Sequence, residues 1–195
     1  MGREFELKFS ASEQSFAALG RQWDDFTVIS METTYFDTPD HALSRRHMTL
    51  RRRMENGVSV CTVKIPDGPN GRGEWELEET DIEAAIPKLC KLGTPEALLA
   101  LTENGLVVSC GARFTRRAKL FSSPKGAVEL ALDEGVLLGG GRELPLREVE
   151  IELKSGPEEL AESYAKALAE MFRLTPETQS KFARAQKLAK GEENG

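Results

Sequence analysis

The chain has 195 residues, of which 39% are hydrophobic and 30% are charged, and its formal net charge is −6 at pH 7. This length fits one domain or at most two small ones. The acidic balance argues against a nucleic acid held on a broad basic face. No apolar run approaches the roughly 20 residues that a membrane helix needs. We therefore expect neither a nucleic acid nor a membrane as a partner.

The cysteines of the chain indicate its redox environment. Cys61, Cys90 and Cys110 stand far apart, and no Cys-x-x-Cys pair occurs. Only two histidines could join them, so we do not expect a structural zinc site. A sparse, odd number of cysteines suits a reducing compartment, and the first residues lack the apolar segment of a secretory signal. The sequence therefore predicts a cytoplasmic protein.

Strict alternation of polar and apolar residues predicts eight β-strands. In chain order they cover 3–9, 32–37, 47–54, 58–65, 72–78, 113–121, 127–133 and 147–154. In the first strand, Glu4, Glu6 and Lys8 share one face, and apolar residues form the other. The short turns between several strands are typical of a mostly antiparallel sheet or barrel.

Capping residues predict four helices between and after these strands. The helices cover 12–23, 94–105, 155–172 and 175–191. Ser12 is a suitable N-cap, and Thr94 and Thr175 each precede a proline that would occupy the first helical position. Strands and helices together predict an α+β protein.

Six of the predicted strands carry charged residues on one face, and these charges together include both signs. The pattern Glu-x-Glu-x-Lys occurs twice, at 4–8 and at 150–154. In an open sheet these faces could simply be solvated. In a closed barrel they would line the lumen, because the apolar faces pack on the outside. Charges in a lumen need ligands, since an unpaired buried charge costs several kcal/mol.

The two signs of charge indicate two kinds of ligand. Mg²⁺ prefers oxygen ligands and commonly takes one or two carboxylates together with water and substrate phosphates. Arg51 and Arg53 can donate paired hydrogen bonds to phosphate oxygens, and Lys8 and Lys64 can act as point charges. Such a lumen predicts metal-assisted phosphoryl transfer. The predicted metal ligands do not distinguish Mg²⁺ from Mn²⁺, because both ions prefer oxygen ligands.

Eight short motifs occur in an order that resembles the CYTH domain, or triphosphate tunnel metalloenzyme, family. They are EFELK at 4–8, YFDT at 35–38, LRRR at 50–53, TVK at 62–64, RGEWE at 72–76, LALDEG at 130–135, EVEIELKSG at 148–156 and QSKFARA at 179–185. The resemblance spans nearly the whole chain. It implies a closed eight-stranded antiparallel β-barrel that forms a tunnel, with helices packed on the outside. It also implies a single domain over 1–190, followed by a flexible tail at 191–195.

The resemblance implies roles for individual residues. The catalytic residues would be Glu4, Glu6 and Lys8. The substrate-binding residues would be Lys8, Arg51, Arg53, Lys64, Glu76, Arg116 and Lys181. The ligands of Mg²⁺ or Mn²⁺ would be Glu4, Glu6, Asp133, Glu150 and Glu152. The roles of Asp37, Glu74, Glu78, Glu148 and Arg184 stay open.

Two arginines compete for one position in the segment ARFTRRAKL. The family pattern of the FTR triplet favours Arg116, whereas simple alternation from Phe114 favours Arg117. A β-bulge would shift the register by one residue. We choose Arg116 as the residue that faces the tunnel.

The expected activity is hydrolysis of inorganic tripolyphosphate, because YFDTPDHAL and SKFARA are similar to the bacterial inorganic triphosphatase branch of the family. The alternatives are a thiamine or nucleoside triphosphatase, an adenylate cyclase of the same family, and a polyphosphate-binding module without catalysis. The cyclase branch typically shows HFDE where this chain has YFDT. The expected partner is a small-molecule triphosphate. The oligomeric state stays open, and a homodimer is one of the options.

Overall fold

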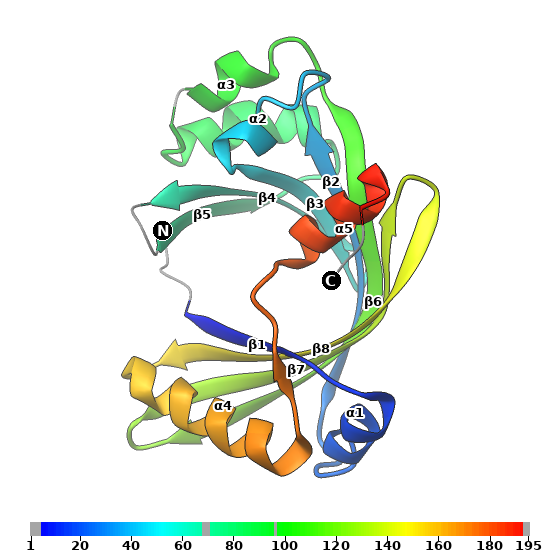
Figure 1. The fold of residues 1–195 in the computed structure, drawn as a ribbon. Helices are drawn as coiled ribbons and strands as arrows, with labels where there is room; N and C mark the ends of the chain where they lie inside the picture. Colours follow the sequence, from blue (N-terminus) through cyan, green and yellow to red (C-terminus); the bar gives the residue numbers. More distant parts are fainter. Residues whose placement is uncertain (1–4, 68–70, 96, 193–195) are drawn as a thin grey trace.

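The computed structural model of the protein describes residues 5–67, 71–95 and 97–192. Its main feature is one strongly curved antiparallel sheet (Figure 1), in the strand order β5-β4-β3-β2-β6-β7-β8-β1-β9. The strands are β1 (Glu6–Ser10), β2 (Thr27–Asp37), β3 (Thr49–Glu55), β4 (Val58–Asp67), β5 (Gly71–Glu78), β6 (Val107–Ser123), β7 (Gly126–Gly139), β8 (Arg142–Ser155) and β9 (Thr175–Pro176).

Helices accompany this sheet on both of its sides. They are α1 (Glu13–Leu19), the short 3₁₀ helix η1 (Ser44–Arg46), α2 (Ile82–Lys91), α3 (Ala97–Thr102), α4 (Glu158–Phe172) and α5 (Lys181–Lys190). The sequence analysis did not predict α2. Its N-cap is Asp81, whose carboxylate accepts hydrogen bonds from the backbone of Glu83 and Ala84. The helix continues although Pro87 lies inside it.

The predicted antiparallel sheet with helices is confirmed, but the closed eight-stranded barrel is not. Among the described residues, nine strands pair in an open order that begins at β5 and ends at β9. Figure 1 shows the sheet curving so that β5 and β4 lie across from β1. Residues 1–4, 68–70 and 193–195, which include Glu4 and most of the expected tail, lie outside the described residues.

The apolar faces of the strands pack under helices on the convex side of the sheet. One group of buried residues joins β1, β7 and β8 to α1 and α4, and includes Leu130, Val149, Ile151, Phe16 and Phe172. A second group joins β3 and β4 to α2 and α3, and includes Leu50, Val63, Ile86, Leu89 and Leu98. Full burial of each such side chain contributes about 1.5–3 kcal/mol. Since these faces are covered, the charged faces of the strands lie on the concave side.

Helix α5 lies on the concave side, so the expectation that all helices pack outside is wrong for α5. The ring of Phe182 is 5.0 Å from that of Tyr35 on β2, measured between centroids. Ala185 is fully buried in a cluster that includes Leu137 and Leu146. The concave face is apolar where α5 packs and charged beyond it. The helix therefore closes one end of the concave side.

The helix begins at Lys181 and not at the predicted Thr175–Pro176. Ser180 is the N-cap, and its hydroxyl accepts a hydrogen bond from the Ala183 amide at 3.1 Å. Thr175–Pro176 instead forms β9, which pairs with β1. Proline lacks an amide hydrogen and is tolerated in an edge strand. The amide of Glu177 donates to the Lys8 carbonyl at 2.8 Å, so the segment before α5 is attached to β1.

The contact of α5 with the end of β7 gives a test of its position. A Cβ atom at Gly139 would lie 2.5 Å from the Ala185 carbonyl oxygen and 2.7 Å from the Ala189 amide nitrogen. We expect Gly139→Ala to loosen α5 and to lower the free energy of unfolding by about 1–3 kcal/mol. Thermal unfolding and hydrogen exchange of the α5 amides measure this. Glu170→Ala on the exposed side of α4 is the control, and unaltered exchange in α5 would contradict the prediction.

Candidate functional site

Charged side chains of three neighbouring strands form rows across the concave face. Glu152 of β8 pairs in register with Glu6 of β1 and with Glu129 of β7. In the next row, Lys8 of β1 lies opposite Glu150 of β8. Residues directly opposite in antiparallel strands have Cβ atoms about 4.5–5.5 Å apart. Carboxylates from the two ends of the chain are therefore neighbours.

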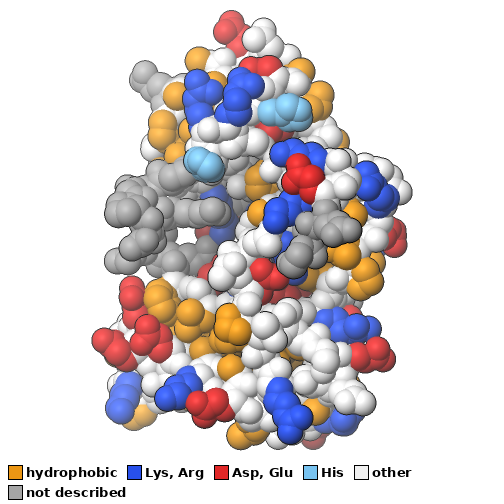
Figure 2. Space-filling view, viewed as in Figure 1, with side chains coloured by type: hydrophobic (Ala, Val, Ile, Leu, Met, Phe, Trp, Pro, Cys, Tyr) orange, Lys and Arg blue, Asp and Glu red, His pale blue; other side chains and the backbone are white. Residues whose placement is uncertain are grey.

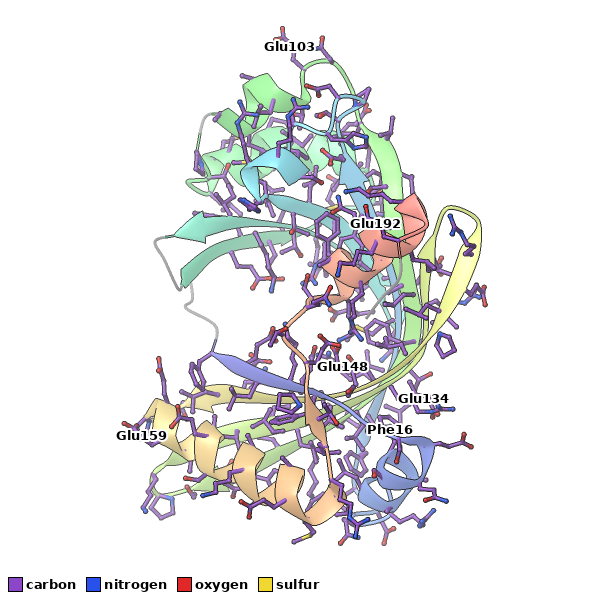
Figure 3. The ribbon with its side chains drawn as sticks, in the orientation of Figure 1. Phe16, Glu103, Glu134, Glu148, Glu159 and Glu192 are labelled. Atoms are coloured by element: carbon purple, nitrogen blue, oxygen red, sulfur yellow. The ribbon has the colours of Figure 1, made fainter. Side chains whose placement is uncertain are left out.

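A buried cluster of charged side chains lies beside the start of α5; we call it the inner cluster. Its members are the carboxylates Asp133, Glu148 and Glu150 and the basic residues Arg116, Lys181 and Arg184. The three acids each place one oxygen within 4.8 Å of the others. Figure 3 shows Glu148 inside the curve of the sheet and Glu134, a neighbour of Asp133 in the chain, on the outside.

The inner cluster is held by short ion pairs. Arg116 donates from Nε and Nη2 to the two oxygens of Asp133, each at 2.7 Å, and Nη2 also contacts Glu150. Lys181 Nζ lies 2.7 Å from Glu150 Oε1 and 2.8 Å from Asp133 Oδ2, and it also contacts Glu148. Arg184 contacts Glu148 as well. Three acidic side chains are thus paired with three basic ones. This pairing avoids the free-energy cost of an unpaired buried charge.

Burial and pairing shift the proton affinities in the inner cluster. Burial raises the pKa of Glu148 to about 7, although Lys181 and Arg184 lower it. Burial also acts on Glu150, but Lys181 and Arg116 outweigh it and hold the pKa of that carboxyl well below its usual range. Burial lowers the pKa of Lys181, but the neighbouring carboxylates outweigh this and raise it. Glu148 is therefore the acid whose pKa lies near neutral pH.

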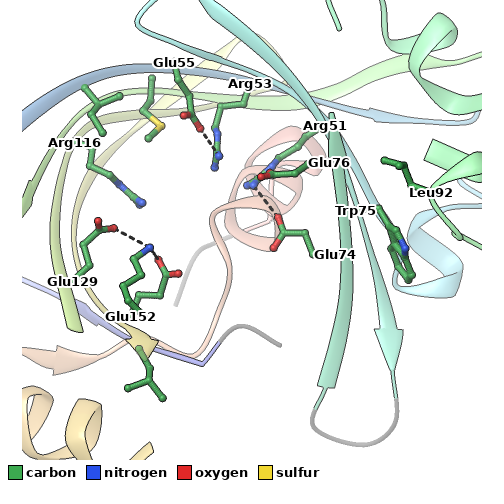
Figure 4. Close-up of a pocket in the computed structure, with 14 residues that line it drawn as sticks. Arg51, Arg53, Glu55, Glu74, Trp75, Glu76, Leu92, Arg116, Glu129 and Glu152 are labelled. Carbon is green, nitrogen blue, oxygen red and sulfur yellow. Dashed lines mark hydrogen bonds and ion pairs between the residues drawn. The ribbon is translucent and has the colours of Figure 1, made fainter. Parts of the chain in front are cut away.

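A cavity of about 710 Å³ lies next to the inner cluster on the concave side (Figure 4). Its lining among the described residues is Ile29, Met31, Arg51, Arg53, Glu55, Glu74, Trp75, Glu76, Leu92, Arg116, Glu129, Glu152, Leu153 and Lys154. Figure 4 shows Arg51 and Arg53 on one side of the space and Glu129 and Glu152 on the other. Arg116 belongs both to this lining and to the inner cluster.

The basic wall of the cavity contains Arg51 and Arg53 and is formed by residues of β3 and β5. Arg53 contacts Glu55, and Arg51 Nη2 lies 3.5 Å from Glu74 Oε1. Within the described residues, the Nε atoms of both arginines are buried without a hydrogen-bond partner. Burial, together with the neighbouring Arg51, lowers the pKa of Arg53. These planar guanidinium groups suit an oxyanion with several oxygens.

The acidic wall contains a lysine to which the sequence analysis assigned no role. Lys154 Nζ lies 2.7 Å from Glu152 Oε2 and 3.3 Å from Glu129 Oε1. Lys8 Nζ lies 3.3 Å from Glu6 Oε1 on the same strand. The second Glu-x-Glu-x-Lys pattern could have identified Lys154, because it places this lysine on the same face as Glu152.

Arg116 faces the concave side and Arg117 faces the convex side. The Arg117 guanidinium lies 5.6 Å from the ring centroids of both Phe16 and Phe26, near α1. The alternation argument for Arg117 placed Phe114 on the outer face. Phe114 in fact lies in the concave cluster under α5, and so the residue two positions later faces the same side without a bulge.

Asp37 is fully buried and organises the loop after β2. Its Oδ1 accepts hydrogen bonds from the Thr38 amide at 2.8 Å and the Leu43 amide at 3.1 Å, and its Oδ2 contacts Ser44. Through these hydrogen bonds, Asp37 fixes the conformation of the loop before β3.

Other residues depart from what alternation suggested. Glu148 is completely buried, whereas Glu78 is exposed. The predicted strand at 47–54 begins two residues too early, because β3 begins at Thr49 and His47 ends η1 with φ 57°. Figure 2 shows both histidines at the surface, near Lys and Arg side chains.

The carboxylates on the concave face fit a hard divalent cation by their chemistry. Oxygen ligands are those that Mg²⁺ and Mn²⁺ prefer. In the inner cluster, three such oxygens lie within 4.8 Å of one another, but basic side chains already contact all three acids. The row of Glu6, Glu152 and Glu129 offers carboxylates nearer to the cavity.

In the part of the chain that the structure describes, every helix is too short or too polar to span a membrane.

Comparisons with known proteins agree with the fold. Residues 2–185 match the CYTH domain family. The chain is 31% identical to the inorganic triphosphatase of Haemophilus influenzae over 165 residues, which are 80% of this chain and 46% of that protein. The chain therefore spans less than half the length of this relative.

Solved structures share the fold at low sequence identity. A candidate adenylyl cyclase from Hippeastrum, described as having a dominant triphosphatase activity, superposes with a TM-score of 0.68 at 19% identity, covering 98% of this chain and 97% of that one. A candidate adenylate cyclase from Bacillus halodurans gives 0.60 at 22% identity, with coverage of 94% and 98%.

The inner cluster predicts a large effect for one lysine. Lys181→Met would leave three buried carboxylates with two bases, so we expect a loss of unfolding free energy on the order of 3 kcal/mol at pH 7. The deficit should shrink towards pH 5, because protonation of a carboxylate removes the uncompensated charge. Chemical denaturation at both pH values measures this, with the exposed Lys190→Met on the same helix as control. Equal stability of the two variants at pH 7 would contradict the prediction.

Proposed function

Because the chain belongs to the CYTH domain family, we propose that it is a metal-dependent phosphohydrolase that cleaves inorganic tripolyphosphate. The name of the Haemophilus relative supports this activity. The observation that carries the proposal is the cavity lined by both basic and acidic side chains, where Arg51 and Arg53 face Glu129 and Glu152. A polyanion and its metal ions need such a combination of groups.

The basic residues bind and orient the phosphates in this proposal. Arg51 and Arg53 donate hydrogen bonds from their guanidinium groups to phosphate oxygens. Arg116 binds the substrate where the cavity meets the inner cluster. The ammonium groups of Lys8, Lys64 and Lys181 add positive charge around the chain of phosphates. Together they hold the terminal phosphorus in place and stabilise the charge that develops on its oxygens.

The carboxylates divide between metal binding and proton transfer. Asp133, Glu150, Glu152 and Glu6, with Glu4 outside the described residues, would hold one or two Mg²⁺ or Mn²⁺ ions. A bound ion of this kind neutralises phosphate charge and lowers the pKa of a water molecule. Glu76 lines the cavity close to Arg51, and we assign it to orienting the attacking water. A carboxylate accepts the proton of that water as its oxygen attacks the terminal phosphorus. The bond from this phosphorus to the bridging oxygen breaks, and orthophosphate and pyrophosphate are the products.

The closed tunnel is part of the same proposal. A substrate that contacts both walls would draw β5 towards β1 and β9 at the other end of the sheet and would exclude water from the concave side. We place the activity in the cytoplasm, which is consistent with the three cysteines being free thiols.

The activity is tested with a substrate panel. We expect phosphate release from tripolyphosphate in the presence of Mg²⁺ or Mn²⁺, with higher kcat/KM than for ATP or thiamine triphosphate, and no release after chelation of the metal. A preference for an organic triphosphate would contradict the assigned substrate. Tight binding of tripolyphosphate without release at saturating metal would instead support a binding module.

The metal role of the first strand is tested by Glu6→Gln. This change keeps the shape of the side chain but removes a charged ligand, so we expect kcat to fall by at least about 100-fold. Steady-state phosphate release measures the effect, and raising the metal concentration should restore part of it. Glu134→Gln, on the convex face of β7, is the control. A Glu6→Gln enzyme with the wild-type rate would show that the assigned role is wrong.

A further inference from the structure

Glu74 lies between two cations that the proposed function assigns to phosphate binding. On β5, Glu74 pairs in register with Lys64 of β4. Its Oε2 lies 3.2 Å from Lys64 Nζ, and its Oε1 lies 3.5 Å from Arg51 Nη2 on β3. The side chains of Arg51, Lys64 and Glu74 are 15%, 18% and 21% exposed. Arg51 and Glu74 line the cavity, and Lys64 lies directly behind Glu74 as its ion-pair partner.

The contacts of Glu74 are looser than those of the inner cluster. Arg116 binds Asp133 with two nitrogens, each at 2.7 Å. Arg51 contacts Glu74 through one nitrogen at 3.5 Å, and its Nε is buried without a hydrogen-bond partner among the described residues. Since Arg51 lines the cavity, an anion there can replace its long contact with Glu74.

Among the described side chains, this part of the sheet also carries as many acids as bases. Three basic residues on the concave face of β3 and β4 stand against three acids on β3 and β5: Arg51, Arg53 and Lys64 against Glu55, Glu74 and Glu76. Glu55 contacts Arg53, and Glu74 is shared by Arg51 and Lys64. An incoming phosphate thus meets two cations whose charge a carboxylate already offsets.

We propose that Glu74 competes with phosphate for Arg51 and Lys64. Its carboxylate holds the two cations when the site is empty, and a phosphate oxygen of substrate or product displaces it. Long, partly exposed ion pairs stabilise little, whereas a full negative charge a few ångströms from a phosphate repels it strongly in a partly buried site. The repulsion is the larger effect. The carboxylate therefore weakens the binding of phosphates at this position and favours their release.

This inference depends on the proposed function for the identity of the substrate, but its test needs no turnover. Calorimetric titration with pyrophosphate and with tripolyphosphate, in chelator and at low salt, measures binding alone. We expect Glu74→Gln and Glu74→Ala to lower the Kd by about tenfold, and Glu74→Asp, which keeps the charge, to stay close to the wild type. The gain should shrink at high salt, because salt screens the repulsion.

The control is Glu162→Gln on the exposed side of α4, which removes the same charge far from the cavity and should leave the Kd unchanged. Equal or weaker binding by both Glu74→Gln and Glu74→Ala would overturn the inference. A carboxylate that only stabilised the fold would give this result, because its loss would not increase the affinity for phosphate. Phosphate release with metal is measured in parallel on the wild type. Absence of release would overturn the proposed function and would leave the binding comparison valid as the test of Glu74.

Discussion

The structure depends on the mutual neutralisation of charges that are buried on the concave side of the sheet. Asp133 and Glu148 are completely buried, and each unpaired charge at that depth would cost several kcal/mol. The compensating groups come from β6 and α5. The curvature of the sheet and the position of α5 are therefore coupled, because the cluster forms only when all of these elements are in place.

The concave face changes its character along β6, β7 and β8. It is apolar under α5, where Ala112, Leu137 and Leu146 lie, and it is charged further along the same strands. The tightness of the ion pairs changes as well. In the inner cluster, Arg116 binds Asp133 with two nitrogens, each at 2.7 Å, whereas Arg51 lies 3.5 Å from Glu74 in the cavity wall. The charged groups of the inner cluster thus have close partners within the protein, whereas Arg51 is held more loosely in the cavity wall.

Sequence patterns predicted much of this arrangement, and the errors have identifiable causes. Alternation identified the charged faces correctly, because side chains of a strand point to opposite sides with a period of two. It failed at Phe114, because an apolar residue can also face the inside where a helix covers it. The Thr-Pro signal at Thr175 failed because the same dipeptide also suits an edge strand.

The amino-acid sequence by itself determined which residues share a face, which strands carry charge and which motifs place the chain in its family. These are local properties, since they follow from the pleat of a strand and from the order of short motifs. Only the tertiary structure decided that α5 enters the concave side, that the strands pair in an open order, and that Glu74 lies between Arg51 and Lys64. Such contacts join residues far apart in the chain, and they depend on how the whole sheet curves.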